Sequence, residues 1–228
     1  MILRLSALQR RKDLTQEQFS RHWCEVHGPL VQAAPGVLRY RQNHVVESSQ
    51  MVRHSRGPAE VDGFAQLWFN DAAAMKEASA SPQFQAAWAD LPAFAGAMTQ
   101  FEVETNHVME RSLTGKGVKR MTLLYAQPGV DIDTFRVRWF DEHAPLVAAF
   151  PGLRGYLQHL VTGTYEFPKG AVVEAGIRCA GILEMWFETR EAMDAAFLSP
   201  EAKATIDHGD LFLAAATTYM VDEVALIG

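Results

Sequence analysis

The sequence predicts an α+β fold in which two tandem βαββαβ repeats of ferredoxin-like type pack as one pseudo-twofold α/β barrel. The first observation is a motif that the 228-residue chain contains twice: residues 19–30 (FSRHWCEVHGPL) recur as residues 135–146 (FRVRWFDEHAPL), an offset of 116 (135 − 19). The second is that the same order of strands and helices follows each motif. The third is a hydrophobic content of 48%, which suffices for two small cores.

The first repeat is expected at residues 1–110. A strand at Ile2–Gln9 precedes a helix that Thr15 caps, with Gln18 three residues later as in a capping box, and that ends before Pro35-Gly36. Alternating or Tyr- and Val-rich segments then predict strands, and Ser81-Pro82 divides two helices because serine caps and proline suits a first helical position. These elements are strands at Leu38–Val46, Asp62–Phe69 and Phe101–Met109, a loop at Glu47–Glu60, and helices at Asp71–Ala80 and Ser81–Ala97.

The second repeat is expected at residues 118–228, after a linker at Arg111–Gly117. Its elements follow in the same order: strand Val118–Ala126, helix Ile132–Ala149, strand Arg154–Thr162, loop Gly163–Gly176, strand Cys179–Phe187, helices from Glu191 that break at Ser199-Pro200, and strand Thr217–Leu226. Beyond the loop the offset becomes 118 (186 − 68), so the loop of the second repeat is two residues longer.

A βαββαβ unit has helices on one face of its antiparallel sheet and leaves the other face bare. Two units in one chain can bury both bare faces by packing sheet against sheet, with the helices outside and a cavity between the sheets. Two independent units on a flexible tether are the alternative, which the seven residues of 111–117 make less suitable.

The bulk composition excludes several classes of function. The net charge is −6, and no basic patch interleaved with aromatic residues indicates nucleic-acid binding. No long apolar run or charged leader predicts a membrane span or export, and the unpaired Cys24 and Cys179 suit a reducing cytoplasm. We find no metal-ligand spacing, phosphate-binding loop or nucleophile elbow, so the sequence predicts neither a metal nor a cofactor.

The repeated motif supplies the candidate catalytic residues His27 and His143. Phe19, Trp23, His27 and Leu30 are spaced i, i+4, i+8 and i+11, so they share the apolar helix face that should lie on the sheet. A neutral imidazole there can act as acid or base near pH 7. The alternative is a buried histidine that shapes the turn at the helix end. His22 is expected on the solvated face.

Candidate ligand-binding residues lie on the helices and on the second and third strands of each repeat. Residues two apart on a strand share a face, so Tyr40, Gln42 and His44 point one way, as do Gln66 with Trp68 and Glu184 with Trp186. An aromatic and amide lining suits a partly polar cavity, and a packed core of mutually satisfied polar groups is the alternative. The predicted binding residues are Trp23, Tyr40, Gln42, His44, Trp68, Trp139, Tyr156, Gln158 and Trp186.

These residues resemble a known family. The run of Lys12, Leu14, Phe19, Trp23, His27-Gly-Pro29, Pro35-Gly36, Tyr40 and Gln42-Asn43-His44 is similar to the EthD domain of the dimeric α/β-barrel superfamily, and the second repeat carries a weaker version. The resemblance implies a barrel that acts on small molecules, as in small-molecule catabolism. Related barrels include isomerases, dehydratases and cyclases, cofactor-free monooxygenases and haem-binding enzymes, so the reaction stays open.

We therefore expect a cytoplasmic barrel enzyme of isomerase or lyase type that uses metal-free acid/base chemistry on a small oxygenated or aromatic metabolite. His27 would transfer the proton, and Trp23 would hold the His27 side chain in place. Tyr40, Gln42 and His44 would orient the ligand. Only the first repeat keeps the full Gln42-Asn43-His44 run, so it is the half expected to be active. The alternatives are a haem-binding or oxygen-using barrel, with His27 or His143 as axial ligand, and a non-catalytic binding or structural barrel. A homodimer of the chain is also compatible with the family.

Overall fold

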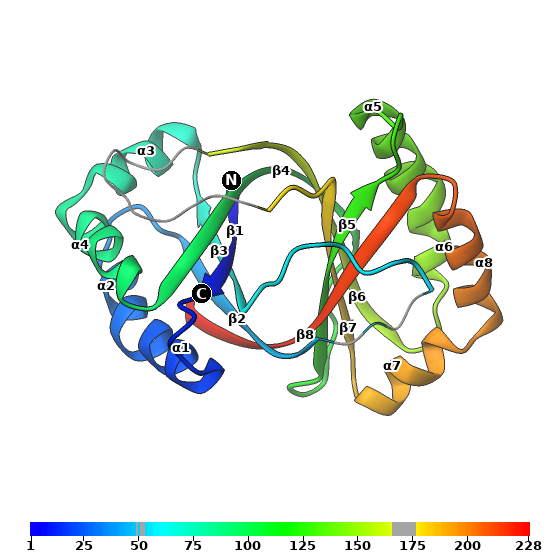
Figure 1. Cartoon of the computed structure of the whole chain (residues 1–228), viewed down its shortest axis with the longest axis horizontal. Coiled ribbons are helices and arrows are strands. Elements are labelled where there is room, and N and C mark those ends of the chain that lie inside the picture. The colour runs from blue at the N-terminus through cyan, green and yellow to red at the C-terminus, as the bar shows by residue number, and fades with distance from the viewer. Residues whose placement is uncertain (49, 51–52, 166–176) are drawn as a thin grey trace.

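The computed structural model describes residues 1–48, 50, 53–165 and 177–228. Eight strands form one closed barrel in the order β1-β3-β2-β8-β5-β7-β6-β4. Figure 1 shows the strands at the centre, helices α1–α4 on one side and helices α5–α8 on the other. The predicted α+β barrel of two βαββαβ repeats, with helices outside, is confirmed. Among the described residues, no helix is long and apolar enough to cross a membrane.

The two repeats have matching elements. The strands are β1 (Ile2–Arg10), β2 (Arg39–Ser48), β3 (Gly63–Phe69) and β4 (Ala95–Met109), then β5 (Val118–Ala126), β6 (Leu153–Thr164), β7 (Gly181–Phe187) and β8 (Leu213–Ile227). The helices are α1 (Gln16–His22), η1 (Trp23–His27), α2 (Gly28–Gln32), α3 (Ala72–Ala80), α4 (Pro82–Asp90) and η2 (Leu91–Ala93), then α5 (Ile132–Arg136), η3 (Val137–His143), α6 (Ala144–Ala148), α7 (Arg190–Phe197) and α8 (Pro200–Gly209).

The last strand of each repeat joins the halves. β4 has 15 residues and pairs antiparallel with β1 of its own repeat and with β6 of the other. β8, also of 15 residues, pairs in the same way with β5 and β2. The prediction that helix Ser81–Ala97 continues to Ala97 is wrong, because the helix stops near Pro92 and β4 begins at Ala95. Proline lacks the N–H that a helix interior needs.

Three apolar clusters fill the molecule. One lies between helices and sheet in each repeat, around Trp23 and Trp139, and the third lies inside the barrel around Phe64 and Tyr219. β2 and β6 each run two residues farther than expected, to Ser48 and Thr164. The rest of the predicted loop 163–176 lies outside the described residues from position 166, as do positions 49, 51 and 52 of loop 47–60.

Candidate functional site

The repeated motif forms a π-helical turn in both repeats. Residues Trp23–His27 are η1 and residues Val137–His143 are η3, where we expected continuous α-helix. In the first repeat the Gly28 N–H donates to the Trp23 carbonyl, five residues back. Such turns widen the helix locally and often occur at functional sites. The tryptophan and the histidine of each motif are buried.

Each tryptophan occupies a space that a strand glycine leaves. A Cβ atom at Gly63 would lie 2.3 Å from the Trp23 ring, and one at Gly181 would lie 2.4 Å from the Trp139 ring. Because Cβ atoms essentially never approach that closely, both positions require glycine as long as the tryptophans stay in place. The two copies therefore share one way of seating the π-turn on the sheet.

The predicted ligand residues Tyr40 and Gln42 hold this turn in place. Gln42 Nε2 donates to the Trp23 carbonyl and to the Tyr40 hydroxyl, both at 2.8 Å, and Trp23 Nε1 donates to the same hydroxyl at 3.2 Å. Gln158 donates to Trp139 and Tyr156 at the same 2.8 Å. A hydroxyl that accepts two bonds keeps its own proton for a third partner.

His27 forms a dyad with Asp90, the last residue of α4. Its Nδ1 lies 3.1 Å from Asp90 Oδ2, and His22 Nε2 lies 2.9 Å from Oδ1 of the same carboxylate. Partial burial opposes ionisation of Asp90, but the hydrogen bonds from His27 and His22 outweigh it and lower its pKa. The carboxylate thereby favours the proton on His27 Nδ1 and leaves Nε2 free to exchange one. His22, expected on the solvated face, is half-buried in this contact.

The second repeat lacks this dyad. The position equivalent to Asp90 is His208 (208 − 90 = 118), and its Nδ1 lies 3.2 Å from His143 Nδ1. Burial, together with the charges of His208 and His54, lowers the pKa of His143 to about 3. A neutral imidazole beside another imidazole has no carboxylate to stabilise the protonated form that a general base must adopt.

We expect the variant His143→Asn to be less sensitive to acid than the wild type. His143 titrates near 6.5 when unfolded and at about 3 when folded, so between these pH values the unfolded chain binds more protons and stability falls as the pH falls. One such group contributes up to about 1.4 kcal/mol per pH unit. Urea unfolding at several pH values between 7 and 4 measures the slope, and parallel curves for variant and wild type would contradict the assignment.

The π-turn residues line a small cavity between helices and sheet. Trp23, His27 and Tyr40 face it together with Arg4 and Gln100, and its volume is about 30 Å³. The equivalent cavity of the second repeat, about 60 Å³, is lined by His143, Arg120 and His54. Gln42 and His44 line neither. His44 packs against the Trp23 ring at 4.6 Å, and burial, partly offset by Asp222, lowers its pKa to about 4.

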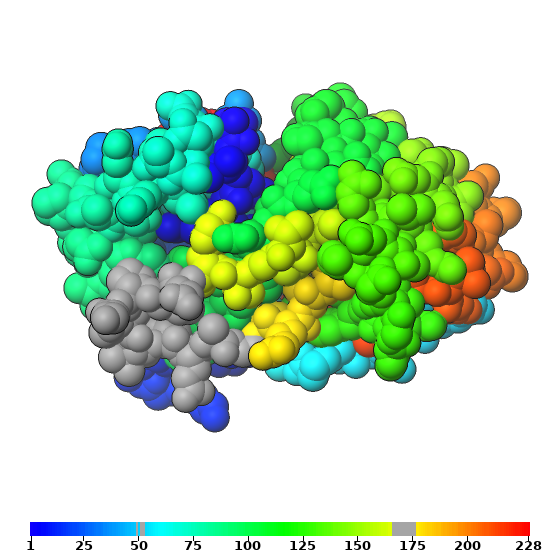
Figure 2. Space-filling view, turned by 90° about the horizontal axis from the view of Figure 1, so that it is seen from above, coloured from blue at the N-terminus to red at the C-terminus, as the bar shows by residue number. Residues whose placement is uncertain are grey.

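Trp68 and Trp186 lie on the opposite face of the sheets. Both line a larger cavity, about 820 Å³, together with His159 and the arginines Arg39, Arg41 and Arg111. Its walls come from the start of β1, from α3 and from the end of β6, segments that meet on the face shown in Figure 2. The predicted binding residues therefore divide between two faces of the sheets and do not form one site.

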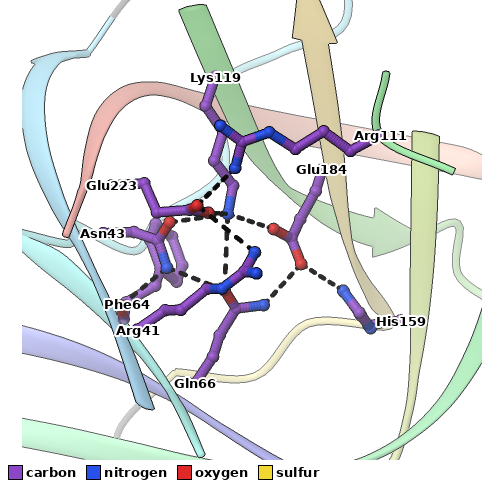
Figure 3. Close-up of polar contacts among 9 residues, drawn as sticks. All are labelled: Arg41, Asn43, Phe64, Gln66, Arg111, Lys119, His159, Glu184 and Glu223. Carbon is purple, nitrogen blue, oxygen red and sulfur yellow. Dashed lines mark hydrogen bonds and ion pairs between the residues drawn. The ribbon is translucent and has the colours of Figure 1, made fainter. Parts of the chain in front are cut away.

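Beside this cavity the barrel interior holds a buried polar network (Figure 3). The Lys119 ammonium pairs with Glu184 and lies 2.7 Å from both Glu223 Oε2 and Asn43 Oδ1. Glu184 Oε1 also lies 2.6 Å from Gln66 Nε2 and from His159 Nε2. Glu184 and Gln66 are equivalent positions (184 − 66 = 118), so they meet at the pseudo-twofold axis. The interior is thus both a polar network and a cavity, the two arrangements that the sequence left open.

The described residues give little support for a metal or a haem. In the described part of the chain, no group of three or more His, Cys, Asp and Glu side chains is placed to hold a metal ion. A haem bound through His27 or His143 would have to open a cavity of about 30 or 60 Å³ to the width of a macrocycle. The aromatic side chains that close these cavities would move much farther than for a small metabolite, so the residues around His27 and His143 do not fit a haem.

Comparison with known proteins supplies the family. The EthD domain model matches residues 11–97 and again residues 127–213. The chain belongs to the EthD domain family. The two EthD matches contain the two π-turns with their Trp and His residues. A search of curated proteins gives no match.

Solved structures resemble this EthD chain along nearly its whole length. An anthrone oxidase-like protein superposes with a TM-score of 0.63 at 14% identity, covering 99% of this chain and 93% of that chain. A proposed monooxygenase from Lactobacillus acidophilus NCFM gives a TM-score of 0.58 at 12% identity with the same coverage. One from Fusobacterium nucleatum gives 0.61 at 10%, covering 97% of this chain and 91% of that chain. At such identities the likeness shows the barrel fold alone.

Proposed function

We propose that this EthD-family chain is a metal-free acid/base enzyme of isomerase or lyase type, acting on a small oxygenated or aromatic metabolite in the helix-side cavity of the first repeat. The observation that carries the proposal is the His27–Asp90 dyad on the η1 turn, at a 3.1 Å Nδ1–Oδ2 distance. In the second repeat an imidazole stands where this carboxylate stands.

The dyad can move a proton between two positions of a substrate. His27 Nε2 would take a proton from carbon beside a carbonyl, and the electron pair would move onto the carbonyl oxygen. Asp90 would stabilise the resulting imidazolium. Return of the proton to another carbon completes an isomerisation, whereas its transfer to a departing β-hydroxyl completes a dehydration. Tyr40, whose hydroxyl accepts two bonds, could donate its proton to the substrate oxygen.

An oxygen-using reaction is the second candidate, because two of the structural neighbours are proposed monooxygenases and one is an anthrone oxidase-like protein. It would begin with the same proton abstraction, because a carbanion or phenolate is the form that reacts with oxygen without a cofactor.

Hydrogen exchange in heavy water tests the proposal directly. Metabolites that co-purify with the protein are identified by mass spectrometry and then incubated in D₂O with the wild type and with Asp90→Asn. We expect deuterium to enter the substrate beside its carbonyl, in the presence of EDTA, and more slowly with the variant. Oxygen uptake by the same mixtures would favour the second candidate. If a metabolite binds but neither takes up deuterium nor reacts with oxygen, both proposed reactions are refuted and the protein is a ligand-binding barrel without turnover.

A further inference from the structure

One arginine occupies the same buried position in both repeats. Arg4 on β1 and Arg120 on β5 are 116 residues apart (120 − 4), the offset of the repeated motif. Their exposures are 5% and 3%, and each lines the helix-side cavity of its own repeat, beside His27 and His143 respectively. Because an arginine is present at this position in both repeats, a buried cation there is a feature of the repeat and not of one local contact.

Aromatic rings surround the Arg4 guanidinium. Its central carbon lies 4.8 Å from the Phe84 ring centroid, 5.5 Å from that of Phe69 and 5.9 Å from that of Trp88. Among the described residues its one side-chain hydrogen bond, to Ser79 Oγ, is long at 3.5 Å, and its Nε has no partner there. Within residues 1–48, 50, 53–165 and 177–228, no carboxylate forms an ion pair with Arg4 or with Arg120.

The Lys119 ammonium shows how this same protein satisfies a buried cation. It is 4% exposed and pairs with the two carboxylates Glu184 and Glu223. Burying a charge without such partners is unfavourable, and stacking on rings offsets only part of that cost. Among the described residues, Arg4 therefore carries a charge without a carboxylate partner and a guanidinium N–H without an acceptor.

We propose that Arg4 binds the carboxylate of the substrate, and that the ligand of the His27 cavity is a small aromatic or unsaturated carboxylic acid. A guanidinium offers two parallel N–H donors to a carboxylate. The aromatic side chains Phe84 and Trp88 line the same cavity and suit a flat apolar body. The cavity of about 30 Å³ has room for little more than one polar group, so the body of the ligand must displace the half-buried Trp88.

The charge of Arg4 persists at neutral pH. Burial, partly offset by the neighbouring Tyr40 hydroxyl, lowers the pKa of Arg4 to about 10. In the second repeat burial lowers the pKa of Arg120 to about 9, and Thr218 Oγ1 accepts one of its hydrogen bonds at 2.9 Å. Arg120 is thus the better satisfied of the two, and we expect the weaker anion binding there.

Binding of benzoate, compared with benzyl alcohol as its uncharged counterpart, tests the inference on the full chain. Calorimetry with the wild type should show benzoate binding on the order of tenfold more tightly than the alcohol. Arg4→Met should lose this preference and keep its affinity for the alcohol, whereas Arg4→Lys should keep part of the preference. Arg120→Met is the matched control and should leave the tighter site intact. No preference in the wild type, or an unchanged preference in Arg4→Met, would overturn the inference.

Thermal unfolding gives a second reading that does not depend on the affinity. Since Arg4→Met removes a buried charge that has no carboxylate partner among the described residues, the midpoint of the variant without ligand should equal or exceed that of the wild type. Benzoate should raise the wild-type midpoint more than the variant's midpoint. A lower midpoint for the variant, with no effect of benzoate on the wild type, would show a purely structural arginine. The inference rests on the proposed function for its choice of site. Arg4-dependent binding of benzoate, together with no deuterium exchange into the co-purified metabolite, would refute the proposed function and leave the inference standing.

Discussion

Lys119→Leu is expected to lower the free energy of unfolding by about 3–5 kcal/mol, the usual effect of removing one partner of a buried ion pair. The variant leaves Glu184, which is 1% exposed, without its cation. Burial alone would raise the pKa of Glu184, but the charges of Lys119 and His159 outweigh burial and lower it. Without Lys119 the Glu184 carboxylate keeps only its hydrogen bonds to Gln66 and His159, so it must either stay charged inside the barrel without an ammonium partner or take up a proton.

The first repeat supplies the matched control. Its residues at the positions of Lys119 and Glu184 are Leu3 and Gln66. The double variant Lys119→Leu/Glu184→Gln therefore installs a neutral pair that the same fold already accepts, and we expect it to recover most of the lost stability. Urea unfolding of the three proteins measures this. Lys116→Leu, at an exposed ion pair with Asp222, should cost less than about 1 kcal/mol. Equal losses in the single and double variants would contradict the account.

The repeat predicted the barrel because its signal is duplicated. Two copies of one strand and helix order leave two bare sheet faces, and the closed barrel buries both. The full lengths of β4 and β8 were missed, and in β4 this is because Ala95–Ala97 reads as the end of a helix when only local propensity is considered. Pairing with Leu8 and its neighbours on β1 makes this segment a strand, and tertiary pairing of that kind overrides propensity.

The π-turns could not be predicted from spacing. Trp23 and His27 are four residues apart in sequence whether the turn is α-helical or π-helical. The π-turn is held by tertiary contacts, because Gly63 leaves space for the Trp23 indole and Gln42 donates to the Trp23 carbonyl. These partners lie 19 to 40 residues away (42 − 23 and 63 − 23). The same long-range contacts hold Tyr40 and Gln42 on the face of the sheet that the helices cover. Trp68 lies on the opposite face, so these predicted binding residues do not line one cavity.

Two residues that we propose to be functional, Arg4 and Asp90, had a signal in the sequence that comparison of the repeats could have revealed. Arg4 interrupts the apolar strand Ile2–Leu8, and Arg120 stands at the same position of the second repeat. A charged residue retained twice within a predicted core strand indicates a buried role. At the equivalent positions Asp90 and His208 the signal is a difference between the repeats. The carboxylate at position 90 gives the first repeat its dyad, and the imidazole at position 208 leaves the second repeat without one.

His27→Ala is expected to reduce turnover by about 10²–10⁴-fold while the fold stays intact. The stability cost should be small, because Asp90 keeps its hydrogen bond to His22 at 2.9 Å. His143→Ala should act mainly on stability, by about 1–3 kcal/mol, since it removes a buried ring that packs 5.3 Å from Phe212 and contacts His208. Each variant needs a denaturation midpoint and the rate of deuterium exchange into the metabolite identified by mass spectrometry.

The two measurements together separate the roles of the histidines. A His27→Ala protein that melts early, while its folded fraction exchanges at the wild-type rate, would make His27 a structural residue of the η1 turn. Equal rate losses in both variants without loss of stability would make both repeats active. Because only the first repeat pairs its π-turn histidine with a carboxylate, we expect the rate to follow His27 and the stability to follow His143.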